Sequence, residues 1–184
     1  NLPIKGTHYT ARDVANQNSI CSWCHYNYGV DMSKPGAQEW YNSVFQKIAH
    51  WGFDFVKVDD LVPYPEEILA VEKAIKNSGR KMVFSLSPGG PTDKRYLPYY
   101  KNAHMLRITS DIWDRQKDID KSFDAWKAYQ GIAYEGFWPD LDMIPFGQLL
   151  LMSPEEYSTK DHDVNLAGHG FNRFLLVRDI VVSH

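Results

Sequence analysis

The sequence predicts an α/β fold in which parallel strands alternate with helices. Short apolar runs rich in Val, Phe and Ile recur along the chain, and each is followed by a stretch with apolar residues at helical spacing. Polar or acidic residues follow several of these runs directly. Both a doubly wound sheet and a (β/α)8 barrel fit this alternation, but no glycine-rich nucleotide-binding motif follows the first strand.

The composition is that of an ordinary globular domain. The chain has 184 residues, of which 43% are hydrophobic and 23% are charged, so one domain is expected. The net charge of -3 gives no indication of a nucleic-acid partner or of an acidic membrane surface. No apolar run reaches the roughly 18 residues that a membrane span needs.

Residues 1–34 are predicted to be a loop-rich segment, because Gly, Asn, Ser and Thr occur there with little periodicity. The two cysteines of the chain, Cys21 and Cys24, lie in this segment with the spacing C-x-x-C. The surroundings do not resemble the strand–helix context of a redox motif, and no second C-x-x-C completes a zinc site. We therefore expect a local disulfide or an incidental pair of thiols.

The first predicted helix covers residues 33–52 and precedes the first strand. Ser33 can cap this helix, Pro35 suits its first turn and Gly52 can end it. The apolar residues that recur at helical spacing are Trp40, Tyr41, Val44, Phe45 and Ile48. A strand follows over residues 53–60, with the sequence FDFVKVDD.

Three further units follow the same pattern. A helix over 64–80 turns Ile68, Val71 and Ile75 to one face, and a strand follows at about 81–90. A short helical patch near 94–103 leads to a strand at 105–111. A helix over 118–133, with Phe123, Trp126 and Tyr129 expected to point inward, leads to a last strand within 135–143.

A complete barrel takes about 250 residues. If the fold is a (β/α)8 barrel, the whole chain, residues 1–184, is therefore only a part of it, with about four strands. Residues 35–173 supply the βα units in this interpretation, and residues 174–184 form an atypical end.

Charged and polar residues gather where the strands end. Side chains alternate between the two faces of a strand, so Lys57 and Asp59 share one face. In βα folds the carboxyl ends of the strands are where active sites are built. The same alternation places further polar side chains together on the later strands: Ser85 with Ser87, Arg107 with Thr109 and Asp111, and Trp138 with Asp140 and Asp142.

Two carboxylates on different strands that face one pocket suit glycoside hydrolysis. One carboxylate attacks the anomeric carbon and the other donates a proton to the leaving oxygen, about 5–5.5 Å apart in retaining enzymes. An ammonium group at Lys57 favours the charged form of Asp59, which suits the nucleophile, and leaves Asp111 as the acid. The alternative stays open that these acids cap helices and that Lys57 and Asp59 form a plain ion pair.

Three stretches, GFDFVKVDD, RITSDIWD and FWPDLDMIPFG, resemble in order and spacing the α-galactosidases of glycoside hydrolase family 27. The lead-in YGVDMSKPGAQEWYNSVFQKIAHWG resembles the family's approach to its fourth strand, especially in bacterial members, and the likeness covers about residues 1–173. The resemblance implies strands 4–7 of a (β/α)8 barrel and a retaining enzyme that releases terminal α-linked galactose without metal or cofactor. It also favours an extracytoplasmic location, periplasmic or secreted.

The resemblance assigns a role to each candidate site residue. Asp59 stands at the position of the nucleophile and Asp111 at that of the acid/base. The expected substrate-binding residues are Lys57, Arg107, Asp142, Trp138, Ser85 and Ser87.

The sequence also departs from the family pattern. Ser85-Leu86-Ser87-Pro88 replaces the Cys-Glu-Trp segment of many members, so N-acetylgalactosamine and arabinopyranose remain alternative sugars. The family's first three strands would precede Asn1, and FLLVRDIVVSH does not resemble its barrel end. The chain could therefore be an inactive barrel fragment or weak sugar binder that associates with itself through open sheet edges.

A second cluster of ionisable residues lies in the segment KDHDVNLAGH. Its spacing matches no known set of metal ligands, so a solvated loop is expected and a metal site is not. The residues are Asp161, His162, Asp163 and His169.

Overall fold

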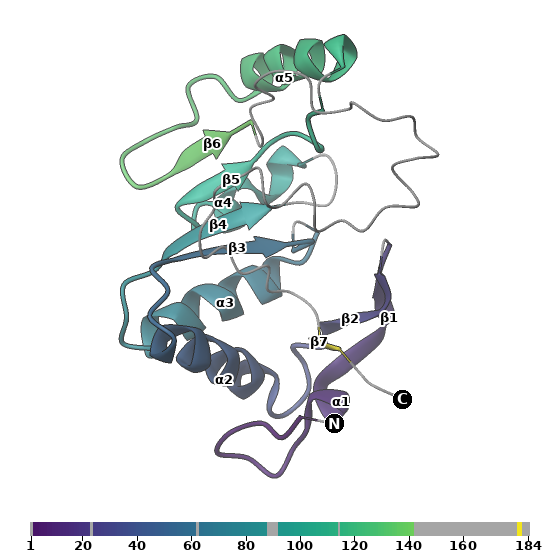
Figure 1. The fold of residues 1–184 in the computed structure, drawn as a ribbon, viewed down its shortest axis with the longest axis vertical. Coiled ribbons are helices and arrows are strands. Elements are labelled where there is room, and N and C mark those ends of the chain that lie inside the picture. Colours follow the sequence, from purple (N-terminus) through teal and green to yellow (C-terminus); the bar gives the residue numbers. More distant parts are fainter. Residues whose placement is uncertain are drawn as a thin grey trace.

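The computed structural model describes residues 2–22, 24–61, 63–87, 92–113, 115–141 and 180–181. Its centre is a four-stranded sheet in the order β3-β4-β5-β6, in which every neighbouring pair is parallel (Figure 1). The strands are β3 (Phe55–Asp59), β4 (Val83–Ser87), β5 (Met105–Arg107) and β6 (Trp138–Asp140).

Helices connect the successive strands. They are α3 (Pro65–Asn77), the turn η1 (Lys94–Tyr96) with α4 (Leu97–Tyr100), and α5 (Gln116–Ala128), while α2 (Ala37–His50) precedes β3. Because strand order follows chain order and every crossover is helical, the fold is that of part of a (β/α) barrel. This confirms the predicted fold class.

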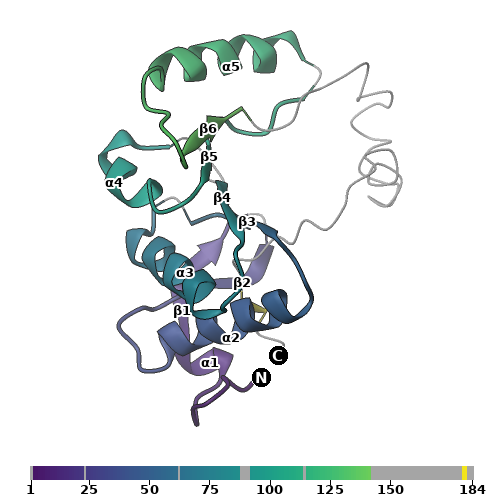
Figure 2. The same ribbon diagram turned by 90° about the vertical axis from the view of Figure 1, so that its left-hand side faces the viewer.

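The core lies between one face of the sheet and the helices. Figure 2 views the strands nearly edge-on, with α3 and α4 on the same side of the sheet. The strand side chains turned to this side are almost fully buried, and burial of each contributes roughly 1.5–3 kcal/mol. They are Val56, Val58, Phe84, Leu86 and Leu106. The buried helical residues include Phe45, Ile48, Ile68 and Val71, as the spacing predicted.

The start of α2 differs from the prediction. The N-cap is Gly36, with φ of 91°, and Ser33 instead bonds to Asp31 Oδ1 through its backbone N–H and its hydroxyl. A Cβ at position 36 would lie 2.8 Å from the Tyr9 ring. Glycine therefore suits this position for both its backbone angle and the close approach of Tyr9.

The prediction for the inner face of α5 was wrong at two of three residues. Tyr129, just beyond the helix, is buried, but Phe123 is 62% exposed and Trp126 is 46% exposed. The buried residues of α5 are Asp118 and Ser122. Periodicity identifies the apolar face of a helix, but it does not show whether another element covers that face.

Residues 1–34, predicted as loop, contain regular structure. A short helix α1 (Ala11–Val14) leads into the antiparallel strands β1 (Ala15–Cys21) and β2 (Cys24–Val30), and β2 also pairs with β7 (Ile180–Val181). Cys21 and Cys24 are register partners across the turn and are free thiols. The rest of the predicted atypical end lies outside the described residues.

A buried carboxylate ties this hairpin to the helices. Glu67, in the first turns of α3, accepts a hydrogen bond from the Val30 backbone N–H at 3.1 Å and a second from the Tyr41 hydroxyl. These bonds join β2, α2 and α3 beside the loop that leaves β3. In the part of the chain that the structure describes, no helix is long and apolar enough to cross a membrane.

Candidate active site

The register of the parallel sheet sets the side chains on the face opposite the helices in two rows. Partners in register point to the same face of a sheet. The row nearer the amino ends of the strands holds Lys57, Ser85, Met105 and Trp138. The row nearer the carboxyl ends holds Asp59 paired with Ser87, and Arg107 paired with Asp140.

Asp59 is held by the backbone turn that ends β3. The Asp60 N–H donates to Asp59 Oδ1 at 3.1 Å and to the Ser87 carbonyl oxygen at 2.8 Å. Asp60 has φ of 60°, the left-handed region that residues other than glycine seldom adopt. Strained backbone of this kind often marks a functional site, and here it fixes one oxygen of the candidate nucleophile.

Arg107 and Asp111 form an ion pair just beyond β5. Arg107 Nη2 lies 3.0 Å from Asp111 Oδ1, and Arg107 Nε donates to the Thr109 carbonyl oxygen at 2.9 Å. The Thr109 hydroxyl donates to the Leu141 carbonyl oxygen at 3.0 Å, and the Ile108 N–H donates to that of Asp140. The segment that carries Asp111 is therefore fastened to the end of β6.

The structure brings most of the predicted site residues to one face of one sheet. Lys57, Ser85 and Trp138 lie one row below Asp59 and Ser87. Asp111 is held at the same carboxyl-terminal edge through Arg107, so both candidate catalytic acids lie at this edge. Their predicted separation and their roles stay predictions.

Some predicted residues lie outside the described part of the chain. These are Asp142 and the ionisable cluster of Asp161, His162, Asp163 and His169. Within the described part, no group of three or more His, Cys, Asp or Glu side chains could hold a metal ion.

The site residues that sequence reasoning passed over are Asp140 and Asp60. Asp140 was noted only as sharing a face with Trp138. Its register with Arg107 places it in the row nearer the carboxyl ends of the strands, called the upper row below. The double acid Asp59-Asp60 was a visible signal, but the left-handed backbone of the second residue was not.

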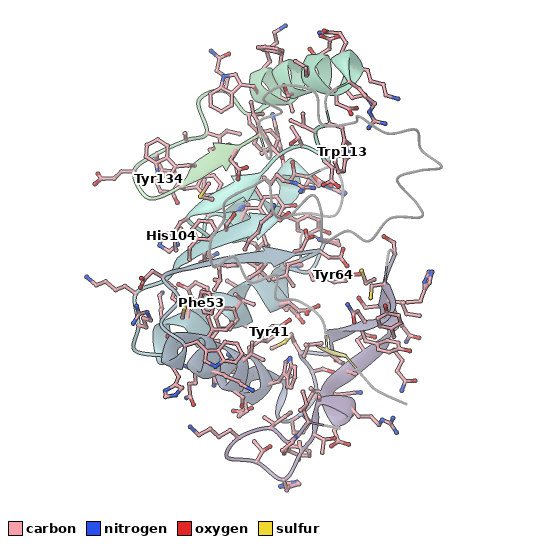
Figure 3. All side chains as sticks on the ribbon, in the orientation of Figure 1. Tyr41, Phe53, Tyr64, His104, Trp113 and Tyr134 are labelled. Carbon is pink, nitrogen blue, oxygen red and sulfur yellow. The ribbon has the colours of Figure 1, made fainter. Side chains whose placement is uncertain are left out.

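Aromatic side chains mark both ends of the sheet. The strands point to the right in Figure 3, where Tyr64 and Trp113 lie at the carboxyl-terminal side and His104 and Tyr134 at the other side. A hollow of about 630 Å³ at the amino-terminal side is lined by residues such as Arg80, Val83 and His104. In βα folds that end of the strands serves stability, so it is not the candidate site.

Two buried tyrosines contact the segment that contains Thr92 and Asp93. They are Tyr100, the last residue of α4, and Tyr129, just beyond α5. Burial raises the pKa of Tyr100 to about 12, although a hydrogen bond from the Asp93 N–H opposes this. Burial also raises the pKa of Tyr129, whose hydroxyl is hydrogen-bonded to Thr92. These contacts fasten the chain at Thr92 and Asp93.

Comparisons with known proteins agree with this architecture, although no protein-family profile matches the chain. The chain is 31% identical over 125 residues to alpha-galactosidase 3 of Hypocrea jecorina. This match covers 61% of the chain and 19% of that protein. It is 34% identical over 116 residues to alpha-galactosidase 2 of Arabidopsis thaliana, covering 59% and 28%. The matches thus take in less than a third of either curated relative.

Solved structures are more similar. A family 27 β-L-arabinopyranosidase from Geobacillus stearothermophilus has a TM-score of 0.74 and 46% identity, covering 79% of this chain and 35% of that one. A Bacillus halodurans protein described as an α-N-acetylgalactosaminidase has a TM-score of 0.62 and 39% identity, with the same coverage.

A parallel βα sheet with acids at its carboxyl-terminal edge, together with these relatives, defines the class as that of the glycoside hydrolases. These relatives support the interpretation of the chain as a fragment of glycoside hydrolase family 27, as its three motifs predicted. It corresponds to part of the length of the family's members.

Proposed function

We propose that the chain is the catalytic part of a retaining exo-glycosidase that releases terminal α-linked galactose. Asp59 is the nucleophile and Asp111 the acid/base. The observation that supports this most is the common position of both acids, which lie at the carboxyl-terminal edge of one parallel sheet on elements separated by β4.

In the first step a carboxylate oxygen of Asp59 bonds to the anomeric carbon, while the bond from that carbon to the leaving oxygen breaks. Asp111 gives its proton to the leaving oxygen. The Asp60 N–H, at 3.1 Å from Oδ1, holds the orientation of the Asp59 carboxylate during the attack. The products are a covalent glycosyl ester on Asp59 and the free aglycone.

In the second step Asp111, now a carboxylate, takes a proton from water as the water oxygen attacks the anomeric carbon. The ester bond breaks and Asp59 is regenerated as a carboxylate. The ion pair with Arg107 suits the charged state in which Asp111 begins this step. Lys57, Ser85, Arg107, Trp138 and Asp142 are the proposed substrate-binding residues, whereas Ser87, the sixth residue that the resemblance suggested for this role, is fully buried.

A second candidate sugar is β-L-arabinopyranose. It has the ring configuration of α-D-galactose without the hydroxymethyl group. The solved structure with 46% identity is named as an arabinopyranosidase, whereas the curated α-galactosidases are 31% and 34% identical. N-acetylgalactosamine is a third candidate, supported by the protein with 39% identity.

The source and the assembly of the protein are also proposals. The bacterial relatives are 39% and 46% identical, above the fungal and plant ones, which supports a bacterial origin. Within the described sheet the outer strands are β3 and β6, so an isolated chain could associate through these edges. Light scattering over a range of concentrations measures that association.

The function is tested with aryl α-galactoside, β-L-arabinopyranoside and α-N-acetylgalactosaminide substrates, on a full-length family 27 protein that contains this sequence. We expect Asp59→Asn to lose essentially all turnover. Asp111→Ala should lower kcat/KM roughly 10²–10⁴-fold for a poor leaving group and far less for a dinitrophenyl group, because that group needs no proton in the first step.

The control variant is Asp54→Asn, because Asp54 is an exposed acid that pairs with Arg80 at the opposite end of β3. This variant should keep full turnover. Unchanged turnover of Asp59→Asn would remove the nucleophile assignment, and failure to cleave any of the three sugars would remove the proposed function.

A further inference from the structure

Ser87 is an unusual member of the upper row. It is fully buried at the end of β4, and its Oγ atom has no hydrogen-bond partner among the described residues. A buried hydroxyl without a partner loses its bonds to water and gains none in return, which opposes folding. A group of this kind in a native structure calls for a reason, and a role in function is a frequent one.

The neighbours of Ser87 suggest what that reason is. Its register partner across the sheet is Asp59, and adjacent strands lie about 4.8 Å apart, so the two side chains are neighbours on one face. The Ser87 carbonyl oxygen already shares with Asp59 Oδ1 the single N–H of Asp60. The backbone around both residues is thus fixed, while the Ser87 hydroxyl needs only a rotation of its own χ1 angle to change its direction.

Burial separates this hydroxyl from both water and the sugar. A fully buried serine does not touch a bound substrate directly, but its proton is not lost in competing bonds to water. The group that would benefit most from such a donor is a carboxylate on the same face. Hydrogen bonds to charged acceptors are stronger than those between neutral groups.

We propose that Ser87 is a positioning residue for Asp59, donating its hydroxyl hydrogen bond to the Asp59 carboxylate when a sugar occupies the site. The proposal rests on the proposed function, in which Asp59 is the nucleophile. The bond would hold the attacking carboxylate in orientation during the first step. It would stabilise the same carboxylate as it leaves in the second step.

The test compares Ser87→Ala, Ser87→Thr and Ser122→Ala in the full-length protein. Ser122 is a matched control, because it is a buried serine whose Oγ donates to the Ile119 carbonyl oxygen on α5. We expect Ser87→Ala to lower kcat roughly 10- to 100-fold, the range of a hydrogen bond to a charged group. Ser87→Thr, which keeps the hydroxyl, should recover most of the rate.

Two further measurements exclude a merely structural role. Because the proposed bond forms only when a sugar is bound, its loss should move the acidic limb of the kcat profile, which reports the enzyme–substrate complex, to higher pH in Ser87→Ala alone. The Tm of this variant should be unchanged or higher, since an unpartnered hydroxyl has been removed.

The outcomes separate this proposal from the proposed function. If the unaltered protein cleaves a sugar and Asp59→Asn does not, an unchanged rate and pH profile for Ser87→Ala overturns the role of Ser87 alone. A Ser87→Ala variant that fails to fold also overturns it, since the hydroxyl would then be structural. If the unaltered protein cleaves none of the three sugars, both proposals fall.

Discussion

Arg107 Nη2 lies 3.0 Å from Asp111 Oδ1, and the two side chains differ sharply in exposure, at 8% for the arginine and 58% for the aspartate. Arg107 is also fixed by its Nε bond to the Thr109 carbonyl oxygen. The guanidinium is buried and contacts both Asp111 and Thr109, and it therefore orients the exposed carboxylate of Asp111. The position of the candidate acid/base is set by a residue at the end of β5.

Replacing Arg107 with Lys should test this dependence. The ammonium group keeps the charge, but it cannot make both the Nε bond to Thr109 and the bond to Asp111 in the fixed fork of arginine. We expect kcat/KM to fall by roughly 10²-fold, the effect of a misplaced catalytic group. Steady-state kinetics measure this loss, and Arg95→Lys, on the exposed turn η1, is the control with normal kinetics. Normal kinetics in Arg107→Lys would show that Asp111 does not need the guanidinium for its position.

The left-handed backbone of Asp60 gives a second prediction. Asparagine tolerates this region, whereas a β-branched residue is strained there by roughly 1–2 kcal/mol. Asp60→Val should therefore unfold at lower urea concentration and lose activity, because the Asp60 N–H no longer holds both Asp59 and Ser87. Asp60→Asn should keep the stability of the unaltered chain within about 0.5 kcal/mol. Equal stability of the two variants would mean that the backbone at this position is not constrained.

These two cases show which parts of the site could be predicted from the sequence. Alternation along one strand was enough to place Lys57 and Asp59 on one face, because the period of a strand is fixed by its geometry. The pairing of Arg107 with Asp140 depends on the register between two strands, which the pattern of either strand alone does not contain. The positive φ at Asp60 goes together with a bond from its N–H to the carbonyl oxygen of Ser87, a residue of the next strand.

The hairpin of β1 and β2 was missed for a related reason. Its own sequence carries few of the β-branched residues that indicate strands, and its anchor is Glu67, 37 positions beyond Val30. Likewise the exposure of Phe123 depends on what packs against α5, which the periodicity of that helix does not contain. Local pattern thus predicted the elements, and contacts distant in sequence decided the rest.

The anchor of the hairpin can be tested at Glu67. Glu67→Ala removes the acceptor of the Val30 N–H and of the Tyr41 hydroxyl in a buried place. We expect a loss of about 2–4 kcal/mol in the free energy of unfolding, since buried donors lose a charged partner. Glu66→Ala, one residue earlier in α3, should lose far less. Hydrogen exchange at the Val30 amide should become faster in Glu67→Ala alone, and unchanged protection there would show that other contacts hold the hairpin.

The buried tyrosine of α4 predicts how stability changes in alkaline solution. Burial raises the pKa of Tyr100 to about 12, whereas an unfolded tyrosine titrates near 10. The folded state therefore holds this proton more tightly, so the stabilisation is complete below pH about 10 and is lost as the pH rises towards about 12. The free energy of unfolding should fall by about 2 kcal/mol across this interval on account of Tyr100.

In Tyr100→Phe, which has no proton to lose, that part of the decline should be absent. Tyr99→Phe, at a more exposed position, should behave as the unaltered chain does. Urea unfolding measured at intervals between pH about 9 and about 12 decides the matter, and parallel declines in all three proteins would assign the alkaline loss to other groups.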